Sequence, residues 1–173
     1  MASTVRKVDV SLDGPPVLSD DRFSPTSRRH LSGPGLRTFL RICDVWGLDE
    51  TRRRRLLGVP ARSTYHNWLK AVREQRPLTL GLDELTRIST ILGIYKALLI
   101  LHGDATEAIA WLRGPHAATV FGGDPPLDLM TSGPLDALLT TRRFLDAARG
   151  GLYMEPNAAD ERPPLADTDI VFG

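Results

Sequence analysis

The chain has 173 residues, of which 42% are hydrophobic, and a net charge of +1. This length gives room for one ordinary domain or two small ones, and the apolar fraction is sufficient for a buried core. The longest apolar run, Ala97–Leu101, is far shorter than the roughly 20 residues of a membrane-spanning helix. Residues 1–14 lack the apolar core of a signal peptide. We therefore expect a soluble, cytoplasmic protein with no membrane partner.

The small net charge conceals an asymmetry along the chain. Residues 28–76 hold 12 Lys/Arg against 4 Asp/Glu, a balance of +8. Residues 77–173 hold 7 against 13, a balance of −6. The front half is therefore suited to a polyanion such as DNA, and the back half is not.

The first 33 residues show no sustained helical or strand period and contain three prolines, at positions 15, 16 and 25. Such a segment buries little apolar surface, so we predict a disordered arm over residues 1–33. Arg28, Arg29 and His30 at its end could contact DNA phosphates, but a solvated charge run is the favoured interpretation.

Two helices are predicted after Pro34. In the first, which ends at Gly47, apolar residues recur at steps of three and four, and Cys43 is expected to be a packed thiol. Asp49 has the side chain of a helix N-cap for a second helix that runs to Leu57. This second helix carries four consecutive arginines. We expect two of them, Arg53 and Arg54, to contact DNA phosphates. The alternative is that these arginines only form a solvated helix face.

A turn over residues 58–60 precedes a third helix, predicted over residues 61–73. The helix–turn–helix order, together with the local positive charge, predicts DNA binding through the major groove. The alternative is a small three-helix packing unit whose polar face meets only water. The outward-facing residues of the third helix, and hence the candidate DNA-binding residues, are Arg62, Ser63, Thr64, His66, Asn67 and Lys70. We assign this DNA-binding region to residues 34–76.

A second helical region is predicted over residues 77–151. Thr79 is expected to cap a long helix that ends at His102. The apolar surface of this helix is wider than one stripe, so we expect the helix to be the structural spine and a homodimer element. Asp104 caps a helix ending at Arg113, and residues 114–133 form an irregular hinge with at most one short helical turn. The last helix runs over residues 134–149, with Arg142 and Arg143 on its outer face.

The stretch from Trp111 to Gly151 carries a family resemblance. Its glycines and prolines fall between periodic segments rather than inside them, in the pattern Trp111, Leu112, Gly114, Pro115, Phe121, Gly122, Pro126, Leu127, Leu129, Gly133, Gly150 and Gly151. This stretch resembles the C-terminal module of the Xre/ParS-type (MbcA-like) antitoxins that are paired with RES-domain toxins. The resemblance implies an all-α fold, a RES-domain toxin protein and promoter DNA as partners, and NAD⁺ as the substrate of the toxin.

Residues 152–173 form a tail with five acidic residues and one arginine, a balance of −4, and with apolar residues at both ends. We predict that the tail is disordered alone. We expect Leu152, Tyr153 and Met154 to anchor it beside the last helix, while Glu155 and later acids lie near the mouth of the toxin's pocket and compete with NAD⁺. The alternative is that the tail only increases solubility. The candidate toxin-binding residues are thus Arg142, Arg143, Leu152, Tyr153, Met154 and Glu155.

No constellation in the sequence predicts catalysis. The four histidines, at positions 30, 66, 102 and 116, lie in different elements and lack the spacing of metal ligands, so no metal site or other cofactor is expected. The chain also has no GxSxG motif and no Walker lysine. We therefore predict a binding protein rather than an enzyme.

Three functions remain open at this stage. The first is an antitoxin that covers the active site of a RES-domain toxin and represses its own operon. The second is a stand-alone transcription regulator whose C-terminal helices only dimerise. The third is an inhibitor whose front domain no longer binds DNA.

Overall fold

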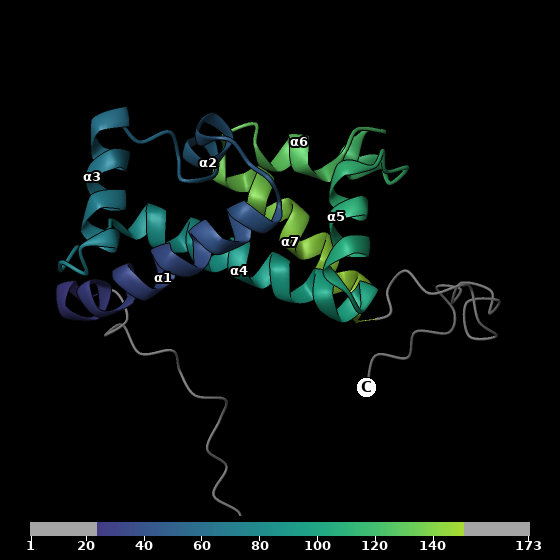
Figure 1. Ribbon diagram of the computed structural model, residues 1–173. Helices are drawn as coiled ribbons and strands as arrows, with labels where there is room; N and C mark the ends of the chain where they lie inside the picture. Colours follow the sequence, from purple (N-terminus) through teal and green to yellow (C-terminus); the bar gives the residue numbers. More distant parts are fainter. Residues whose placement is uncertain (1–23, 151–173) are drawn as a thin grey trace, which may run out of the picture.

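The computed structural model describes residues 24–150, and every regular element in that range is helical (Figure 1). The prediction of an all-α fold is confirmed. The elements are α1 (Pro25–Val45), α2 (Glu50–Leu56), α3 (Arg62–Arg73), α4 (Leu82–His102), α5 (Ala105–Arg113), the 3-10 helix η2 (Thr119–Phe121), α6 (Pro126–Met130) and α7 (Leu135–Arg149).

Helix α1 begins well before the expected residue. The Ser24 side chain accepts a hydrogen bond from the backbone N–H of Ser27, and Pro25 occupies the first helical position, where the proline ring has the correct φ. Pro34 lies inside the helix and not at its start. The prediction of a disordered arm over residues 1–33 is therefore wrong for residues 25–33, while residues 1–23 lie outside the described range.

A buried hydrogen-bond relay explains why the first half of α1 is ordered. The hydroxyl of Ser32, fully buried, donates to the carbonyl of Arg28 and accepts from the backbone N–H of Leu80 at 2.9 Å. This N–H lies in the connector before α4, where a donor without a partner is costly to bury. The early turns of α1 are thereby attached to a segment about 50 residues further along.

Helices α2 and α3 follow the predicted helix–turn–helix order. Asp49 caps α2 by accepting from the backbone N–H of Arg52 at 2.8 Å, as expected. After α2 the chain turns through Gly58 and Val59, which both have positive φ, 83° and 60°. A positive φ is unusual for the β-branched Val59, so the turn holds it there against its local preference.

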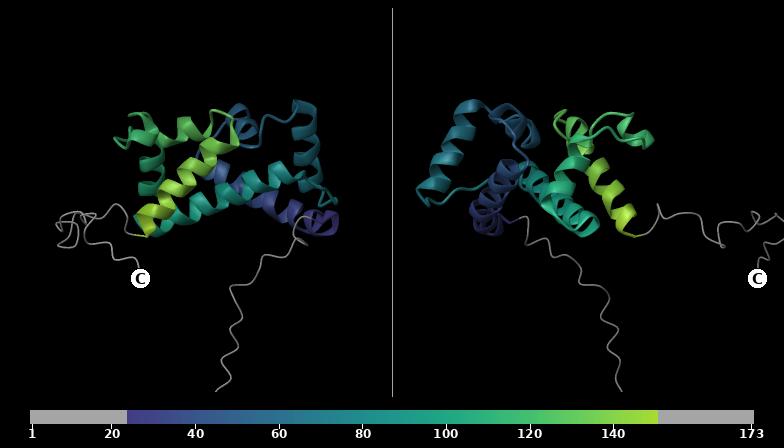
Figure 2. Two further views of the ribbon diagram at one scale, coloured as in Figure 1. Left: turned by 180° about the vertical axis from the view of Figure 1, so that it is seen from behind. Right: turned by 45° about the vertical axis from the view of Figure 1, so that its right-hand side comes forward.

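Helix α4 is the spine of the molecule, as the sequence predicted. It packs against α1 on one side and against α7 and α5 on the others, and both views of Figure 2 show α7 running beside it. By length and composition alone α4 could also cross a membrane, but its residues Ile88, Ile91 and Ile94 are buried among the other helices. The helix starts after Gly81, without a side-chain cap, so the prediction of Thr79 as the cap is wrong.

The elements after α4 also follow the predicted order. Asp104 caps α5 through its side-chain oxygen, which accepts from the backbone N–H groups of Thr106 and Glu107. Between α5 and α7 the chain forms only η2 and the five-residue helix α6. In Figure 1, α3 lies at one end of the molecule and α5 at the other, with α2 and α6 between them.

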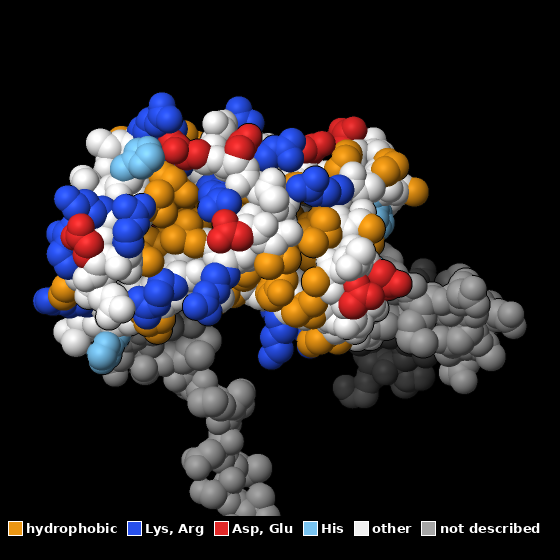
Figure 3. All heavy atoms as spheres, in the orientation of Figure 1, with side chains coloured by type: hydrophobic (Ala, Val, Ile, Leu, Met, Phe, Trp, Pro, Cys, Tyr) orange, Lys and Arg blue, Asp and Glu red, His pale blue; other side chains and the backbone are white. Residues whose placement is uncertain are grey.

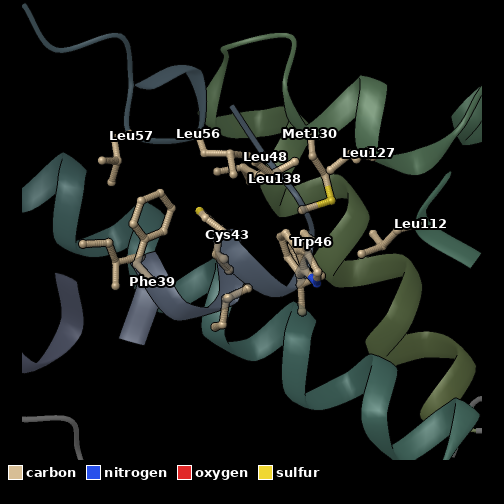
Figure 4. Packing of buried hydrophobic residues seen from close by; sticks show 14 of the residues in the cluster. Phe39, Cys43, Trp46, Leu48, Leu56, Leu57, Leu112, Leu127, Met130 and Leu138 are labelled. Carbon is tan, nitrogen blue, oxygen red and sulfur yellow. The ribbon is translucent and has the colours of Figure 1, made fainter. Parts of the chain in front are cut away.

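One hydrophobic core joins both halves of the chain. Trp46 at the end of α1 points toward Leu112, Leu127 and Met130 from the C-terminal helices (Figure 4). The carbonyl of Trp46 also accepts a hydrogen bond from the Arg113 guanidinium of α5. The front and back regions therefore share one core.

Candidate DNA-binding face and partner-binding surface

The residues predicted to bind DNA lie together on α3. Tyr65 is buried and Trp68, Leu69 and Val72 are half-buried, so the opposite side of the helix faces solvent. Because successive helical residues are about 100° apart, five of the six predicted residues share that exposed side. We call them the polar face of α3: Arg62, Ser63, His66, Asn67 and Lys70. The sixth, Thr64, is half-buried at the edge.

Glu50, in the first turn of α2, bridges two residues of this face. One carboxylate oxygen lies 2.9 Å from Nε of Arg62, and the other lies 3.3 Å from Nε2 of His66. The sequence alone did not identify this bridge. The contact arises because the α2–α3 turn brings the start of α2 beside the start of α3, which sequence spacing does not reveal.

The two arginines predicted to contact phosphates are engaged within the chain. Arg53 donates to the carbonyl of Leu48 and to the carboxylate of Asp44, both at 2.7 Å. Arg54 donates through two nitrogens to the carbonyl of Pro60, at 3.0 and 2.8 Å. Both guanidinium groups thus donate hydrogen bonds to backbone carbonyls at the two ends of α2. Phosphate contact by Arg53 and Arg54 stays a prediction, and it would require these hydrogen bonds to rearrange.

The neighbouring arginines of α2 are more exposed. Arg55 is exposed and has no hydrogen bond or ion pair within residues 24–150, and Arg52 is 44% exposed, with Asp128 of α6 at 3.6 Å. Arg37 of α1 and Arg73 of α3 line a surface hollow of about 520 Å³. Figure 3 shows that Lys and Arg side chains gather over the end of the molecule that holds α1, α2 and α3. The net charge of residues 28–76 predicted this basic end, but it did not show which arginines are engaged in hydrogen bonds within the chain.

The back half carries an apolar groove at the other end of the molecule. We call it the aromatic groove. It measures about 420 Å³ and is lined by Leu101, His102, Trp111, His116, Ala118, Phe144, Leu145 and Ala148.

Stacked and edge-on ring contacts form the wall of the aromatic groove. Trp111 and Phe144 stack with ring centres 6.2 Å apart, and His116 meets the edge of Phe144 at 5.2 Å. Next to the groove, Ile100 remains 54% exposed. Apolar surface grouped in this way is typical of a site that a partner or another segment covers.

The two arginines predicted to bind a toxin differ in their surroundings. Arg142 pairs with Asp146 at 2.6 Å and lies over Gly93 of α4, where a Cβ atom would come within 1.1 Å of its guanidinium. Arg143 is 71% exposed, with Asp136 at 3.7 Å. Arg142 is thus packed into the fold and Arg143 is free to contact a partner. The other candidates, Leu152, Tyr153, Met154 and Glu155, lie outside the described residues.

Cys43 is a packed thiol, as the sequence predicted. Burial raises the pKa of Cys43 from 9.0 to about 12, while nearby Arg53 lowers it and Asp44 raises it to a smaller extent. A protonated thiol is a poor nucleophile. Over residues 24–150 we find no group of three or more His, Cys, Asp or Glu residues placed to hold a metal ion.

A short helix, a tight turn and a second helix with an exposed polar face, all packed on a common core, define a helix–turn–helix protein. Residues 28–93 match the antitoxin Xre-like helix–turn–helix domain, and residues 97–151 match the antitoxin Xre/MbcA/ParS C-terminal toxin-binding domain. The chain belongs to the Xre/MbcA/ParS antitoxins, which confirms the resemblance drawn from the sequence.

A curated relative spans most of the chain. It is the uncharacterized protein y4oB of Sinorhizobium fredii (strain NBRC 101917 / NGR234), which is 39% identical over 128 residues, covering 74% of this chain and 94% of the relative. The two matched domains meet inside α4, between residues 93 and 97. The boundary therefore falls within the helix that packs against α1 and against α7 and α5.

Proposed function

We propose that this antitoxin neutralises a RES-domain toxin that consumes NAD⁺, and that it represses its own promoter through α3. The observation that carries the proposal is the presence of two separate exposed surfaces on one shared core. The polar face of α3 lies at one end, and the aromatic groove and Arg143 lie in the toxin-binding domain at the other. NAD⁺ would belong to the toxin, and the antitoxin itself would act in the cytoplasm as a binding protein without a cofactor.

The charge of the toxin-binding half supports inhibition by covering the active site of the toxin. A pocket for the anionic dinucleotide NAD⁺ needs cationic or donor groups for the pyrophosphate. The back half of this chain is acidic, with a balance of −6 over residues 77–173, and Glu155 and its neighbours supply carboxylates just after α7. Complementary charge of this kind favours the docking of the antitoxin over the pocket mouth.

The DNA-binding half supports autorepression. The polar face of α3 offers an amide, a hydroxyl, an imidazole and two cations to a groove, which are the groups that read base edges and hold phosphates. Arg55 adds an exposed cation one helix away. DNA binding is then expected to weaken steeply with salt, because each neutralised phosphate releases counterions.

A homodimer is part of the proposal, with α1 and α4 as its contact surface. The helices around α4 bury Ile88, Ile91, Ile94, Ala97 and Leu98, whereas Leu82, Ile100 and Leu101 remain exposed. A second apolar groove of about 340 Å³ remains between α1 and α4, bordered by Leu31, Pro34, Leu85 and Leu92. Leu31 is 53% exposed there, and a two-fold related copy would bury it.

The experiment that tests the antitoxin proposal is reconstitution with the protein encoded in the neighbouring reading frame, which the proposal expects to be a RES-domain toxin. Mixing the two chains should give a stable complex on gel filtration and should suppress NAD⁺ loss. A second sample, in which the antitoxin ends at Gly151, separates binding from inhibition. A complex that leaves NAD⁺ consumption at its full rate would refute inhibition by covering, and the lack of any complex would refute the RES assignment.

The alternative function is a stand-alone regulator whose C-terminal helices only dimerise. The basic end of the molecule fits this alternative equally well. The match of residues 97–151 to a toxin-binding domain favours the antitoxin. Co-expression separates the two, because a regulator alone would not relieve the toxicity of the neighbouring gene product.

A further inference from the structure

The aromatic groove lies beside the C-terminal end of α7. Ala148, in the last turn of α7, is one of its lining residues, and Gly150 caps α7. Opposite α7 the groove is bounded by Trp111, His116 and Ala118. A segment that follows Gly150 therefore starts at the rim of the groove.

We propose that the aromatic groove is the docking site of the chain's own residues Leu152–Met154. The groove would thus hold the start of the acidic tail on the surface of the toxin-binding domain.

Chain connectivity supports this occupant. Fully extended residues span about 3.3–3.6 Å each, so Met154 lies within roughly 14 Å of Gly150 whatever the path of the chain. Tethering at so short a distance gives the segment a high effective concentration at the groove, which an unlinked peptide would lack. The other apolar end of the tail, Ile170–Phe172, is joined by a linker longer by about 18 residues and has a correspondingly lower effective concentration.

The chemistry of the segment also matches the lining. The aromatic groove is lined chiefly by apolar side chains and by the rings of Trp111 and His116, which meet edge-on. Tyr153 provides a ring with a polar end that can remain in water, and Met154 provides a flexible thioether that packs well on aromatic edges. Leu152, Tyr153 and Met154 are moreover an uncharged run directly before the acidic residues.

The consequence concerns the carboxylates that follow. If residues 152–154 occupy the groove, Glu155 leaves it at the rim, beside the exposed end of α4. The acidic tail then projects from a fixed point on the toxin-binding domain, which lowers the entropy lost when it meets a partner. This inference concerns the antitoxin alone, so its test needs no toxin and can fail while the proposed function stands.

Cysteine trapping in the full chain tests the proposal. The variant carrying Ala118→Cys and Tyr153→Cys places one thiol on the groove wall and one in the docking segment. Native Cys43 is buried and does not compete. We expect an intramolecular disulfide to form under mild oxidation about tenfold faster than in the matched control carrying Arg143→Cys and Tyr153→Cys, in which the same tail thiol meets a thiol on the exposed face of α7 that does not line the groove.

Each other outcome overturns the proposal. Equal rates in the two variants would mean that residues 152–154 do not reside in the groove. Faster trapping of a variant carrying Ala118→Cys and Phe172→Cys would assign the groove to the end of the tail. Disulfides formed between two chains, in proportion to protein concentration, would assign it to a second copy.

A second measurement uses the chain without new cysteines. The ring-proton resonances of Trp111 and Phe144 should shift between the full chain and the chain ending at Gly150, and Tyr153→Ala should reproduce much of that shift. Leu165→Ala, a matched change elsewhere in the tail, should leave the resonances in place. Identical spectra for the full and shortened chains would overturn the docking of residues 152–154.

Discussion

Glu50 holds Arg62 by a 2.9 Å contact between a carboxylate oxygen and Nε, so an acid of α2 orients the first cation of the polar face of α3. The same carboxylate approaches His66 at 3.3 Å. One carboxylate thus contacts two candidate DNA-binding side chains of α3. It also places a negative charge beside a surface that would meet phosphates.

Replacing Glu50 by glutamine should therefore tighten DNA binding. The carboxylate of Glu50 would repel a DNA phosphate bound at this face. Removing that repulsion at contact distance is worth about 1 kcal/mol in water, or roughly a fivefold gain in affinity at low salt for every DNA sequence tested. Anisotropy titrations of promoter DNA and unrelated DNA measure it. Glu107→Gln, a change of the same kind in the exposed first turn of α5, is the control and should have no effect. Unchanged or weaker binding by Glu50→Gln to both DNAs would contradict this prediction.

Arg53 and Arg55 should differ sharply in their effects on stability. Arg53→Ala removes hydrogen bonds to Leu48 and Asp44, and we expect a loss of about 1–3 kcal/mol in the free energy of unfolding. Arg55→Ala removes an exposed side chain with no partner in residues 24–150, so the expected change is within about 0.5 kcal/mol.

Urea denaturation of both variants, with DNA titrations alongside, separates the two roles. Arg55→Ala should weaken binding to all DNA sequences without loss of stability. Equal stability of the two variants would show that the internal bonds of Arg53 contribute little to folding.

Local signals in the sequence were sufficient for most helix boundaries. Gly47 and Asp49 marked the break between α1 and α2, and Asp104 marked the start of α5, because caps and breakers act within a few residues. The start of α1 was missed although its signal is local. Ser24 followed by Pro25 is a cap followed by a proline at the first helical position, whereas the apolar periodicity begins only after Pro34.

The candidate site was predictable only in part. Period and charge located the polar face of α3, because its exposed residues follow from the buried positions of one helix. They did not reveal that Arg53 and Arg54 bind backbone carbonyls, or that Glu50 reaches Arg62 twelve residues away. These contacts depend on how the turn after α2 folds back, and residue spacing does not encode that geometry.

Gly93→Ala should be close to neutral for stability although a Cβ atom would come within 1.1 Å of the Arg142 guanidinium. The flexible end of Arg142 can move into solvent, and the surface pair with Asp146 is worth at most about 1 kcal/mol. Alanine in mid-helix recovers about 1 kcal/mol relative to glycine, so we expect a net change within roughly 1 kcal/mol.

Gly58→Ala provides the contrast, because Gly58 has a φ of 83° and its Cβ would come within 2.9 Å of Asp83. This variant should lose at least about 1 kcal/mol. Thermal unfolding of the two variants measures the difference. A marked loss of stability in Gly93→Ala would mean that the position of Arg142 is fixed more firmly than its exposed ion pair suggests.

Cys43 should remain unreactive toward thiol reagents at pH 8 in the folded chain. Because its pKa is raised from 9.0 to about 12 by burial, the folded state keeps the proton that the unfolded state releases. Its contribution to stability is fully present below pH 9 and is lost as the pH rises toward 12, by up to about 1.4 kcal/mol per pH unit.

The measurement compares the free energy of unfolding at pH 8 and pH 10.5 in the natural chain and in Cys43→Ala. The natural chain should lose more stability over this interval than the variant does. Rapid labelling of Cys43 at pH 8 without unfolding would refute the buried, protonated thiol.

Asn67→Ala and Lys70→Ala should separate base reading from phosphate contact on the polar face of α3. The amide of Asn67 can bond a base edge in two places, so its loss should cost about 1–3 kcal/mol on promoter DNA and little on unrelated DNA. The ammonium of Lys70 attracts phosphates regardless of sequence, so its loss should weaken binding to both DNAs. It should also reduce the slope of log affinity against log salt by about 0.9. Titrations at several salt concentrations distinguish the two. A promoter affinity that neither substitution changes would mean that α3 does not enter the groove, and that DNA, if bound, meets the arginines of α2 instead.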